Sequence, residues 1–234
     1  RSMGVAAAGE FGAPMPGVGV APAEQGTTQV SIVDRDGDVV VLTSTIESAF
    51  GSYHMTAGGF LLNNQLTDFS REPTDSADRA VANRLQGGKR PRSSMAPTLV
   101  FARRADGTRG DFVMATGSPG GAAIIQYVIK TLVGVLDWGL DAQQASALID
   151  FGAVNGPRTF VGGEHPAVDL SDGGRNDGLY RGLQALGHEV DLSAQGSGIA
   201  TIVRRASAAG QAVYDGGADP RREGVAIGPL ARFR

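Results

Sequence analysis

The stretch 27-TTQVSIVDRDGDVVVLTST-45 predicts a β-hairpin. Polar and apolar residues alternate from Thr28 to Arg35, and a second, more apolar run returns from Asp38 to Thr45. The Asp36-Gly37 pair between the runs suits a tight turn, because glycine readily adopts the positive φ that such turns need. Taken alone, this is the pattern of an ordinary hairpin, so any functional role of its first and last threonines must be inferred from the rest of the chain.

Length and composition limit the class of protein. The chain has 234 residues, enough for one domain with a full core, and a formal net charge of -3. A nucleic-acid partner is not indicated, because no basic stripe is present. The absence of cysteine excludes a disulfide, a thiol nucleophile and a thiolate metal site. His54, His165 and His188 lack metal-ligand spacing, so we expect no metal and no other cofactor.

The start of the chain differs in composition from the remainder. Residues 1–26 show no apolar periodicity and are rich in Gly, Ala and Pro, which predicts a flexible linker, and residues 27–234 would then form one domain. The linker shows no charged segment followed by an apolar segment, so we expect no signal peptide in this chain. No run of 18 apolar residues occurs in the sequence, so a membrane span is not expected either.

Three segments predict helices. Residues 121–136 are apolar on all sides, which favours a buried helix. Asp141 and Gln144 form a capping-box pattern, which would start a second helix over residues 142–149. Leucines at positions 179, 183 and 186 follow a helical period, so a third helix is expected over residues 177–186, ended by Gly187.

Short apolar runs predict strands, and polar runs predict loops. Residues 46–55 have the composition of a loop, and residues 70–92 are polar enough for a surface loop or lid. Strands at both ends of the chain with helices between them indicate an α+β layered domain. The predicted strands, besides the hairpin, cover residues 59–62, 98–103, 111–116, 188–192, 199–205 and 211–214, and residues 149–161 are expected to be extended.

Four motifs occur in a fixed order along the chain. They are GTTQVS from Gly26, LLNNQLTDFS from Leu61, PRSSMAPT from Pro91 and GSPGG from Gly117. Together they resemble the small, catalytic subunit of the gamma-glutamyltransferase family, and the resemblance extends from Thr27 to about residue 228. It implies the four-layer αββα fold of N-terminal-nucleophile hydrolases, which the pattern of strands and helices alone would not select.

The resemblance implies an enzyme that hydrolyses or transfers γ-glutamyl groups from glutathione and related amides through a γ-glutamyl-threonine ester. Thr27 would be the nucleophile, released by self-cleavage of the Gly26–Thr27 bond. Its new α-amine would be the base. The reference pKa of an α-amine, about 7.7–8.0, leaves much of it neutral near pH 7. Processing and activity would therefore be one event.

Other family roles fall on residues that the sequence alone would treat as structural. Thr45 would orient the nucleophile, although its position equally suits an ordinary β-branched strand residue. The backbone N–H groups of Gly120 and Gly121 would form an oxyanion hole at the start of the buried helix, where such groups are unpaired. Without the resemblance, the two glycines would be a simple turn.

Substrate recognition would use both charged and hydroxyl side chains. Gln65 and Asp68 match family positions that hold the substrate α-amine, and Ser93 and Ser94 match those that hold the α-carboxylate. Without the family, Asp68 would be a solvated turn residue and the serines a turn pair. Glu47 stands where well-studied members have Asn, so it would either strengthen binding of the amine or change the acyl group that is accepted.

The resemblance also implies partners and a location. One precursor would give a large and a small subunit, and residues 1–26 would be the tail of the large subunit, or else a cloning remnant. The large subunit would supply an arginine for the α-carboxylate. Water, an amino acid or a peptide would accept the γ-glutamyl group. Many relatives are exported, so we expect a periplasmic or extracellular protein.

Two alternative functions remain open from the sequence. The first is a related acylase of the glutaryl, cephalosporin or poly-γ-glutamate type, which keeps the mechanism but changes the acyl group, and the substitution at Glu47 is the reason to consider it. The second is a catalytically silent, unprocessed structural subunit, which the uncut lead before Thr27 would fit.

Overall fold

The computed structural model describes residues 26–153, 158–207 and 209–228. The linker predicted for residues 1–26 therefore lies, apart from Gly26, outside the described residues. The predicted hairpin is confirmed: β1 (Thr27–Val33) and β2 (Val39–Thr45) are antiparallel, in a register that places Thr27 opposite Thr45. Asp34 closes the turn, because its carboxylate accepts hydrogen bonds from the N–H groups of Asp36 and Asp38, both at 2.9 Å.

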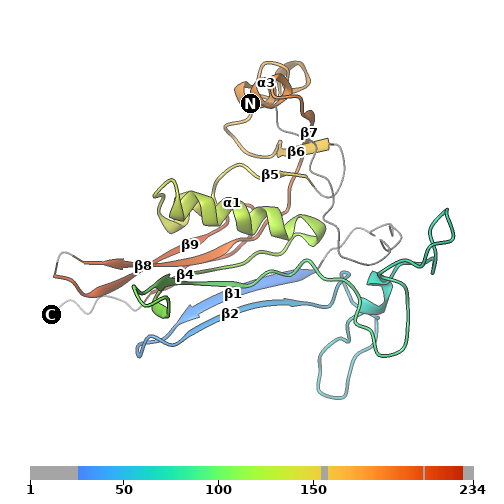
Figure 1. The fold of residues 1–234 in the computed structure, drawn as a ribbon, viewed down its shortest axis with the longest axis horizontal. Coiled ribbons are helices and arrows are strands. Elements are labelled where there is room, and N and C mark those ends of the chain that lie inside the picture. The colour runs from blue at the N-terminus through green and yellow to red at the C-terminus, as the bar shows by residue number, and fades with distance from the viewer. Residues whose placement is uncertain (1–25, 154–157, 208, 229–234) are drawn as a thin grey trace.

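A four-stranded antiparallel sheet forms the centre of the molecule, in the order β3-β4-β8-β9. All four strands were predicted, and β9 runs on beyond the predicted end at residue 214. Figure 1 shows the sheet with the hairpin below it. The strands are β3 (Thr98–Arg103), β4 (Arg109–Thr116), β8 (Ala200–Ala206) and β9 (Ala212–Ala218).

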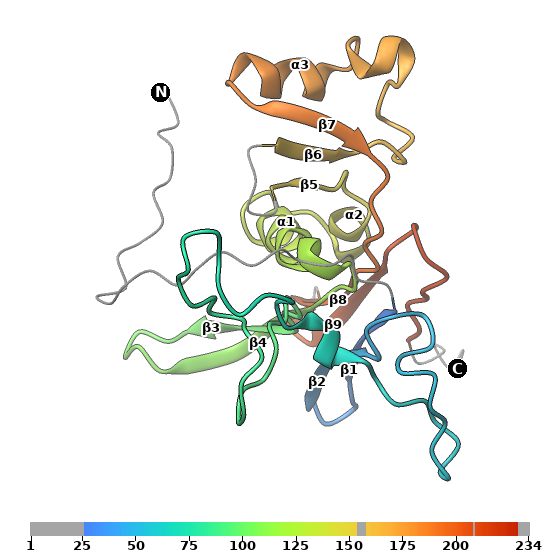
Figure 2. The same ribbon diagram turned by 90° about the vertical axis from the view of Figure 1, so that its right-hand side faces the viewer.

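Helices cover one face of this sheet, and the hairpin covers the other. A 3-10 turn (Gly121–Ala123) leads into α1 (Ile124–Leu136), and α2 (Ala142–Ser146) follows with its predicted capping box in place. The main core lies between the helices and the sheet and includes Met114 and Val203. On the opposite face, the hydroxyl of Ser31 donates to the carbonyl of Ala200 at 2.8 Å. The described residues thus stack as helix, sheet and hairpin (Figures 1 and 2), which confirms the α+β layering.

A smaller three-stranded sheet lies beyond the helices (Figure 2). In it β6 pairs antiparallel with β5 and parallel with β7. Asp177 caps the helix that follows, accepting a hydrogen bond from the N–H of Tyr180 at 2.9 Å. The predicted extended segment over residues 149–161 is present as two strands, with residues 154–157 outside the described part. The elements are β5 (Phe151–Gly152), β6 (Arg158–Gly162), a 3-10 turn (Ser171–Gly174), α3 (Gly178–Ala185) and β7 (Glu189–Ser193).

Three predictions were wrong. Residues 59–62 form no strand, because Gly59 has φ 82° and turns the chain, leaving only an isolated bridge between Met55 and Leu61. Helix α2 ends at Ser146, and the carbonyl of Leu148 instead accepts hydrogen bonds from two buried cations. Helix α1 is not buried all round, because no described element covers the side that carries Ile125, Ile129 and Leu136.

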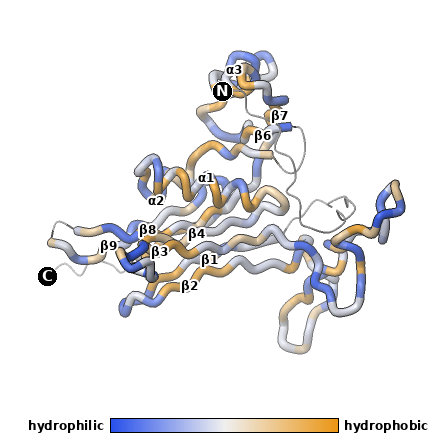
Figure 3. Tube along the Cα trace, in the orientation of Figure 1, coloured by the Kyte–Doolittle hydropathy of each residue, from blue (hydrophilic) through white to orange (hydrophobic). Residues whose placement is uncertain are grey.

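The hairpin has an unusual distribution of side chains. Its face toward the four-stranded sheet carries the hydroxyl groups of Thr27, Thr43 and Thr45, whereas its outer face is apolar and exposed. Figure 3 shows that both β1 and β2 contain apolar residues. An exposed apolar face of this kind marks a surface that another element covers. The exposed apolar residues are Val30, Ile32, Val40 and Leu42.

A buried ionic network ties the C-terminal segment to α1. Lys130 Nζ lies 2.6 Å from Asp150 Oδ1, and both side chains are almost completely buried. Arg221 Nε lies 3.3 Å from the other oxygen of Asp150, and Arg221 also pairs with Glu164 and Asp219. Burial lowers the pKa of Lys130, and the attraction of Asp150 opposes that shift. The network fixes the turn over residues 219–222 against the helix layer.

We expect Lys130→Met to lower the free energy of unfolding by roughly 3–5 kcal/mol, because it leaves a buried carboxylate without one of its two cations. The matched control is Lys89→Met, since Lys89 lies in a loop and donates only to a backbone carbonyl there. Urea unfolding monitored by circular dichroism measures both changes. Equal small losses for the two variants would mean that the network contributes nothing to stability.

Candidate active site

Two hydroxyl groups and one carbonyl group form a continuous hydrogen-bond chain where the hairpin begins. Thr27 is 7% exposed, and its Oγ1 donates to Thr45 Oγ1 at 3.1 Å. Thr45 Oγ1 donates in turn to the carbonyl of Gly26 at 3.2 Å and accepts from the N–H of Glu47 at 2.8 Å. A hydroxyl has one donor hydrogen and two acceptor positions, so the hydrogen-bonding capacity of the Thr45 hydroxyl is fully satisfied. It links the hydroxyl of Thr27 to the carbonyl that precedes it.

Gly26 has a conformation that requires glycine. Its φ is 126°, which side chains other than hydrogen rarely allow. A Cβ at this position would also lie 2.9 Å from the carbonyl oxygen of Glu47 and 3.1 Å from that of Ser48. Glycine at this position therefore leaves room for the carbonyl groups of Glu47 and Ser48, and the hydrogen bond from Thr45 holds the carbonyl of Gly26.

The Thr27 end of the hairpin opens into a cavity of about 460 Å³. Six of the nine predicted site residues line it, coming from segments far apart in the sequence. They are Thr27, Thr45, Glu47, Gln65, Asp68 and Ser93.

Asparagine side chains build the wall that carries Gln65 and Asp68. Asn64 Oδ1 accepts from both the N–H and the hydroxyl of Ser48, at 3.1 and 3.0 Å. Asn63 Oδ1 accepts from the N–H of Gln65, which begins the 3-10 turn Gln65–Asp68. These three hydrogen bonds explain why consecutive asparagines precede the turn: Asn64 holds it to the loop after β2, and Asn63 starts it.

The carboxylate of Asp68 is buried in the cavity wall. The side chain is 4% exposed, and Oδ1 has no hydrogen-bond partner among the described residues. Burial is the main cause of its raised pKa; the nearby Glu47 raises it further, and Arg92 lowers it. Glu47 is itself 5% exposed with φ 74°, a costly conformation for a residue other than glycine. Two adjacent carboxylates, one with an unsatisfied oxygen, suit a cationic ligand.

Three predicted site residues lie elsewhere among the described residues. Ser94 is outside the lining of the cavity, although its neighbour Ser93 is part of it. Gly120 and Gly121 have φ 136° and 57°, and begin the turn into α1. A Cβ at Gly120 would lie 2.4 Å from the ring of Tyr127, so this position also requires glycine. The contact with Tyr127 thus accounts for Gly120, and the positive φ of Gly121 also favours glycine.

A second cavity, of about 350 Å³, lies on another side of Thr27. Pro119, the residue before Gly120, lines it together with Thr27 and Arg222. Arg222 Nη1 donates to the carbonyl of Thr27 at 3.5 Å, and its Nη2 donates to Gly196 at 2.7 Å. The C-terminal segment and the GSPGG motif therefore both reach Thr27. The cavity that they line also includes residues of the hairpin, but none of the predicted ligands of the amine.

Sequence reasoning missed several lining residues. Thr43 and Asn63 were assigned no role, although Thr43 lies in the predicted hairpin and Asn63 in the LLNNQLTDFS motif. Arg92 lies between Pro91 and Ser93 in the PRSSMAPT motif, and Arg90 lies two positions earlier. The available signal was the charge of Arg92 inside a block otherwise made of small and apolar residues. Among the described residues, no three His, Asp or Glu side chains gather to hold a metal ion, and no helix is long and apolar enough to cross a membrane.

A buried threonine at the start of a strand, bonded through a second hydroxyl to the carbonyl before it, fits the class of N-terminal-nucleophile hydrolases. Residues 8–229 match the family model described as gamma-glutamyltranspeptidase. The chain belongs to the gamma-glutamyltranspeptidase family. It is 34% identical over 203 residues to the glutathione hydrolase proenzyme of Bacillus subtilis (strain 168), an alignment that covers 86% of this chain and 30% of that relative.

Solved structures of the family show the same fold. The gamma-glutamyltranspeptidase of Pseudomonas nitroreducens, complexed with L-DON, aligns with a TM-score of 0.67 and 27% identity over 86% of this chain and 99% of that chain. A mutant of the Helicobacter pylori enzyme aligns with a TM-score of 0.66 and 27% identity over 83% and 100%. The helix, sheet and hairpin layers are thus this chain's part of the four-layer αββα fold that the motifs implied.

We expect Asp68→Asn to increase the free energy of unfolding at pH 7. Because the folded state raises the pKa of Asp68 above 3.8, the ionised carboxylate destabilises the folded protein, and stability is regained as the pH falls through the raised pKa. The advantage of the variant should therefore shrink toward pH 4 and vanish below it. Urea unfolding across this range measures it, with Asp36→Asn in the exposed turn as control. A pH-independent difference would contradict the assignment.

Proposed function

We propose that the protein is a γ-glutamyl hydrolase and transferase, acting on glutathione and related γ-glutamyl amides through an ester on Thr27, and matured by cutting at Gly26–Thr27. The observation that carries this proposal is the hydrogen-bond chain from Thr27 through Thr45 to Gly26. It joins the attacking hydroxyl, a proton-bearing partner and the scissile carbonyl in one place. Family membership supports the choice of reaction.

The same chain of groups explains the cutting reaction. Thr27 Oγ1 attacks the carbonyl carbon of Gly26, and the hydroxyl of Thr45 donates to the carbonyl oxygen as negative charge develops on it. The C–N bond breaks, the proton released by the Thr27 hydroxyl passes to the nitrogen of Thr27, which becomes a free amine, and Gly26 is left as an ester on Thr27. Water then hydrolyses that ester. The products are a free Thr27 and a chain ending in Gly26.

Turnover repeats this chemistry on a substrate. The new α-amine of Thr27 accepts the hydroxyl proton, and its reference pKa of about 7.7–8.0 suits this task near neutral pH. The hydroxyl oxygen attacks the γ-carbonyl, and the amine of the leaving group departs with a proton. Gly120 and Gly121 supply N–H groups to the intermediate in this scheme. Water then gives hydrolysis, and an amino acid or peptide amine gives transfer.

The charges of the larger cavity support a donor with a free α-amine. Asp68 and Glu47 present two carboxylates, and Gln65 adds an amide, within a space lined by Thr27. An ammonium group in this space would offset the repulsion between the carboxylates, whereas a glutaryl group would add no positive charge. Glu47 therefore favours the γ-glutamyl reading over an acylase for amine-free donors. Ser93 and Ser94 are the proposed hydroxyl ligands of the α-carboxylate.

A second subunit completes the proposal. The relative from Bacillus subtilis is named a proenzyme, and this chain covers 30% of its length. The exposed apolar faces of the hairpin and of α1 supply surfaces on which a large subunit would pack. That subunit would also bring the arginine for the α-carboxylate. Export to the periplasm or the cell exterior stays a prediction from the family resemblance.

The function is tested on the full precursor, with its natural upstream half. We expect a new terminus at Thr27 by intact mass and N-terminal sequencing, and hydrolysis of L-γ-glutamyl-p-nitroanilide by the cut protein. Thr27→Ala should abolish both, a loss of at least about 10⁴-fold in kcat, because no other group replaces the nucleophile. Turnover of glutaryl-p-nitroanilide alone would establish the acylase instead, and a wild-type chain that stays uncut would establish a silent subunit.

Thr45→Val tests the hydrogen-bond chain directly. Removing the hydroxyl takes away the donor to the Gly26 carbonyl, so self-cutting should slow by roughly 10²–10³-fold. The rate is read from the appearance of the Thr27-terminated fragment on gels over time. Thr43→Val is the matched control, because Thr43 lies on the same face of β2 but donates to Gln29. If both variants cut at the wild-type rate, Thr45 has no role in processing.

A further inference from the structure

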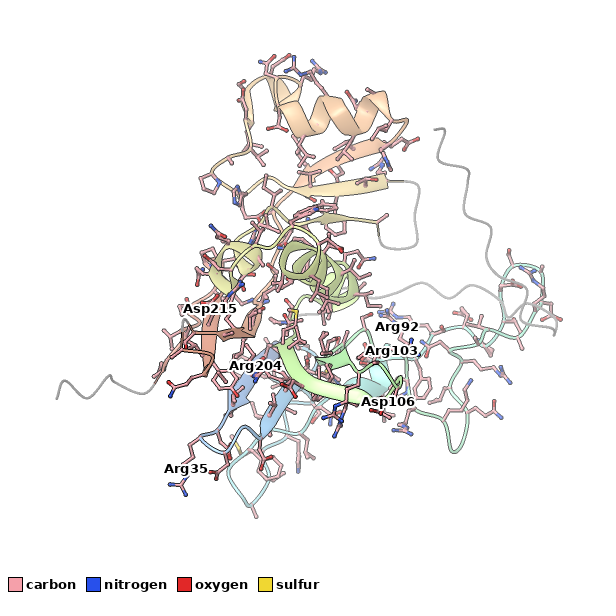
Figure 4. The ribbon with its side chains drawn as sticks, turned by 60° about the vertical axis from the view of Figure 1, so that its left-hand side comes forward. Arg35, Arg92, Arg103, Asp106, Arg204 and Asp215 are labelled. Atoms are coloured by element: carbon pink, nitrogen blue, oxygen red, sulfur yellow. The ribbon has the colours of Figure 1, made fainter. Side chains whose placement is uncertain are left out.

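One wall of the larger cavity carries a guanidinium group that has no assigned role. Arg92 lines the cavity together with Thr27, Asp68 and Ser93. Its Nε and Nη2 atoms are buried from solvent. Figure 4 shows Arg92 at the inner end of the long loops, on the side of the sheet and away from their outer tips. The residue as a whole is half-buried, and a positive charge beside a ligand-sized cavity is suited to an anionic group.

The position of Arg92 is fixed by one amide side chain. The N–H of Arg92 donates to Asn83 Oδ1 at 2.9 Å, and Asn83 Nδ2 donates to the carbonyl of Asp68 at 2.6 Å. Asn83 therefore joins the stretch before Ser93 to the turn that carries Asp68. This bridge sets the spacing between the positive and the negative wall of the cavity, although neither stretch belongs to a sheet.

The positive charge of Arg92 acts on the carboxylates of the same cavity. Arg92 lowers the pKa of Asp68, in opposition to burial and to Glu47. The cavity thus combines two carboxylates with a guanidinium group. An α-amino acid group has an ammonium and a carboxylate on one carbon, so it complements both signs at once.

Arg90 is the other arginine of this cavity, and it differs from Arg92 in burial. It lines the same space but is exposed to solvent. An exposed cation contributes little to binding, because water screens its charge. Arg92, which is half-buried and next in sequence to Ser93, is therefore the better placed of the two to form a charge-assisted hydrogen bond.

We propose that Arg92 is a specificity-determining residue of this chain, and that its guanidinium group binds the α-carboxylate of the γ-glutamyl donor beside Ser93. The inference rests on the proposed function and deepens it, because the family resemblance assigns that carboxylate to the two serines and to an arginine of the large subunit. A guanidinium group has five N–H donors, so Nη1 can donate to a carboxylate in the cavity while Nε and Nη2 stay buried.

Three p-nitroanilide donors separate the contact with the carboxylate from other effects. L-γ-Glutamyl carries both α groups, 4-aminobutyryl lacks the carboxylate, and glutaryl lacks the amine. The processed two-subunit enzyme is assayed as wild type, Arg92→Leu, Arg92→Lys and Arg90→Leu. Arg84→Leu is the matched control, because Arg84 lies outside the described lining of the cavity and donates to the carbonyl of Val81.

We expect Arg92→Leu to lower kcat/KM for the L-γ-glutamyl donor by roughly 10–100-fold, mainly through KM, since a hydrogen bond to a charged group is lost. The 4-aminobutyryl donor should change less than about 3-fold, so that the preference for a carboxylate collapses. Arg92→Lys should recover part of the loss, and the Arg84 and Arg90 variants should keep the wild-type preference.

Equal losses on the L-γ-glutamyl and 4-aminobutyryl donors would overturn the proposal and make Arg92 structural. A carboxylate preference that is lost in Arg90→Leu and kept in Arg92→Leu would also overturn the proposal. Should Arg92→Leu fail to fold, Arg92→Lys decides, because it keeps the charge but removes the guanidinium donors. An unchanged preference for the carboxylate in that variant would contradict a contact made by the guanidinium group. A wild-type enzyme inactive on all three donors would refute the proposed function and, with it, this inference.

Discussion

The proposed active site depends on the hydrogen bond between the two threonines that begin and end one hairpin. Thr27 and Thr45 are register partners, so the contact between their hydroxyls exists only in this alignment of β1 and β2. A shift by one residue would turn Thr45 to the outer face and bring an apolar or exposed neighbour inward. The turn at Asp34, the polar inner face and the apolar outer face all favour the observed register.

The polar inner face has an energetic consequence. Hydroxyl groups and the side chain of Gln29 occupy positions where a hairpin usually buries apolar side chains, and the cavity beyond them holds buried charges. Such groups destabilise the fold unless they are paired. Stability is supplied elsewhere, by the core between α1, α2 and the sheet and by the ionic network around Arg221. The same network fixes the turn that brings Arg222 to the carbonyl of Thr27.

Local patterns were enough to predict the elements, but not the way in which they meet. The hairpin and the capping box at Asp141 were predictable because each depends on residues a few positions apart, whereas the cap at Asp177 was not predicted. The exposed side of α1 was not predictable, since burial depends on what covers a helix. Arg92 was not predicted because the family motif assigned roles only to its neighbours. The folded chain shows that Asn83 links the backbone of Arg92 to that of Asp68.

The direction of the hydroxyl groups gives one further step. Before cutting, the only hydrogen of Thr45 Oγ1 points to the carbonyl of Gly26, so Thr45 accepts the hydrogen bond from Thr27. In the proposed reaction that carbonyl departs with the upstream chain, and Thr45 loses its acceptor. Its hydroxyl can then rotate and donate to Thr27 Oγ1, which leaves the hydrogen of Thr27 free to point to its own new amine. The loss of one acceptor would thus convert a cutting arrangement into a turnover arrangement without any movement of the backbone.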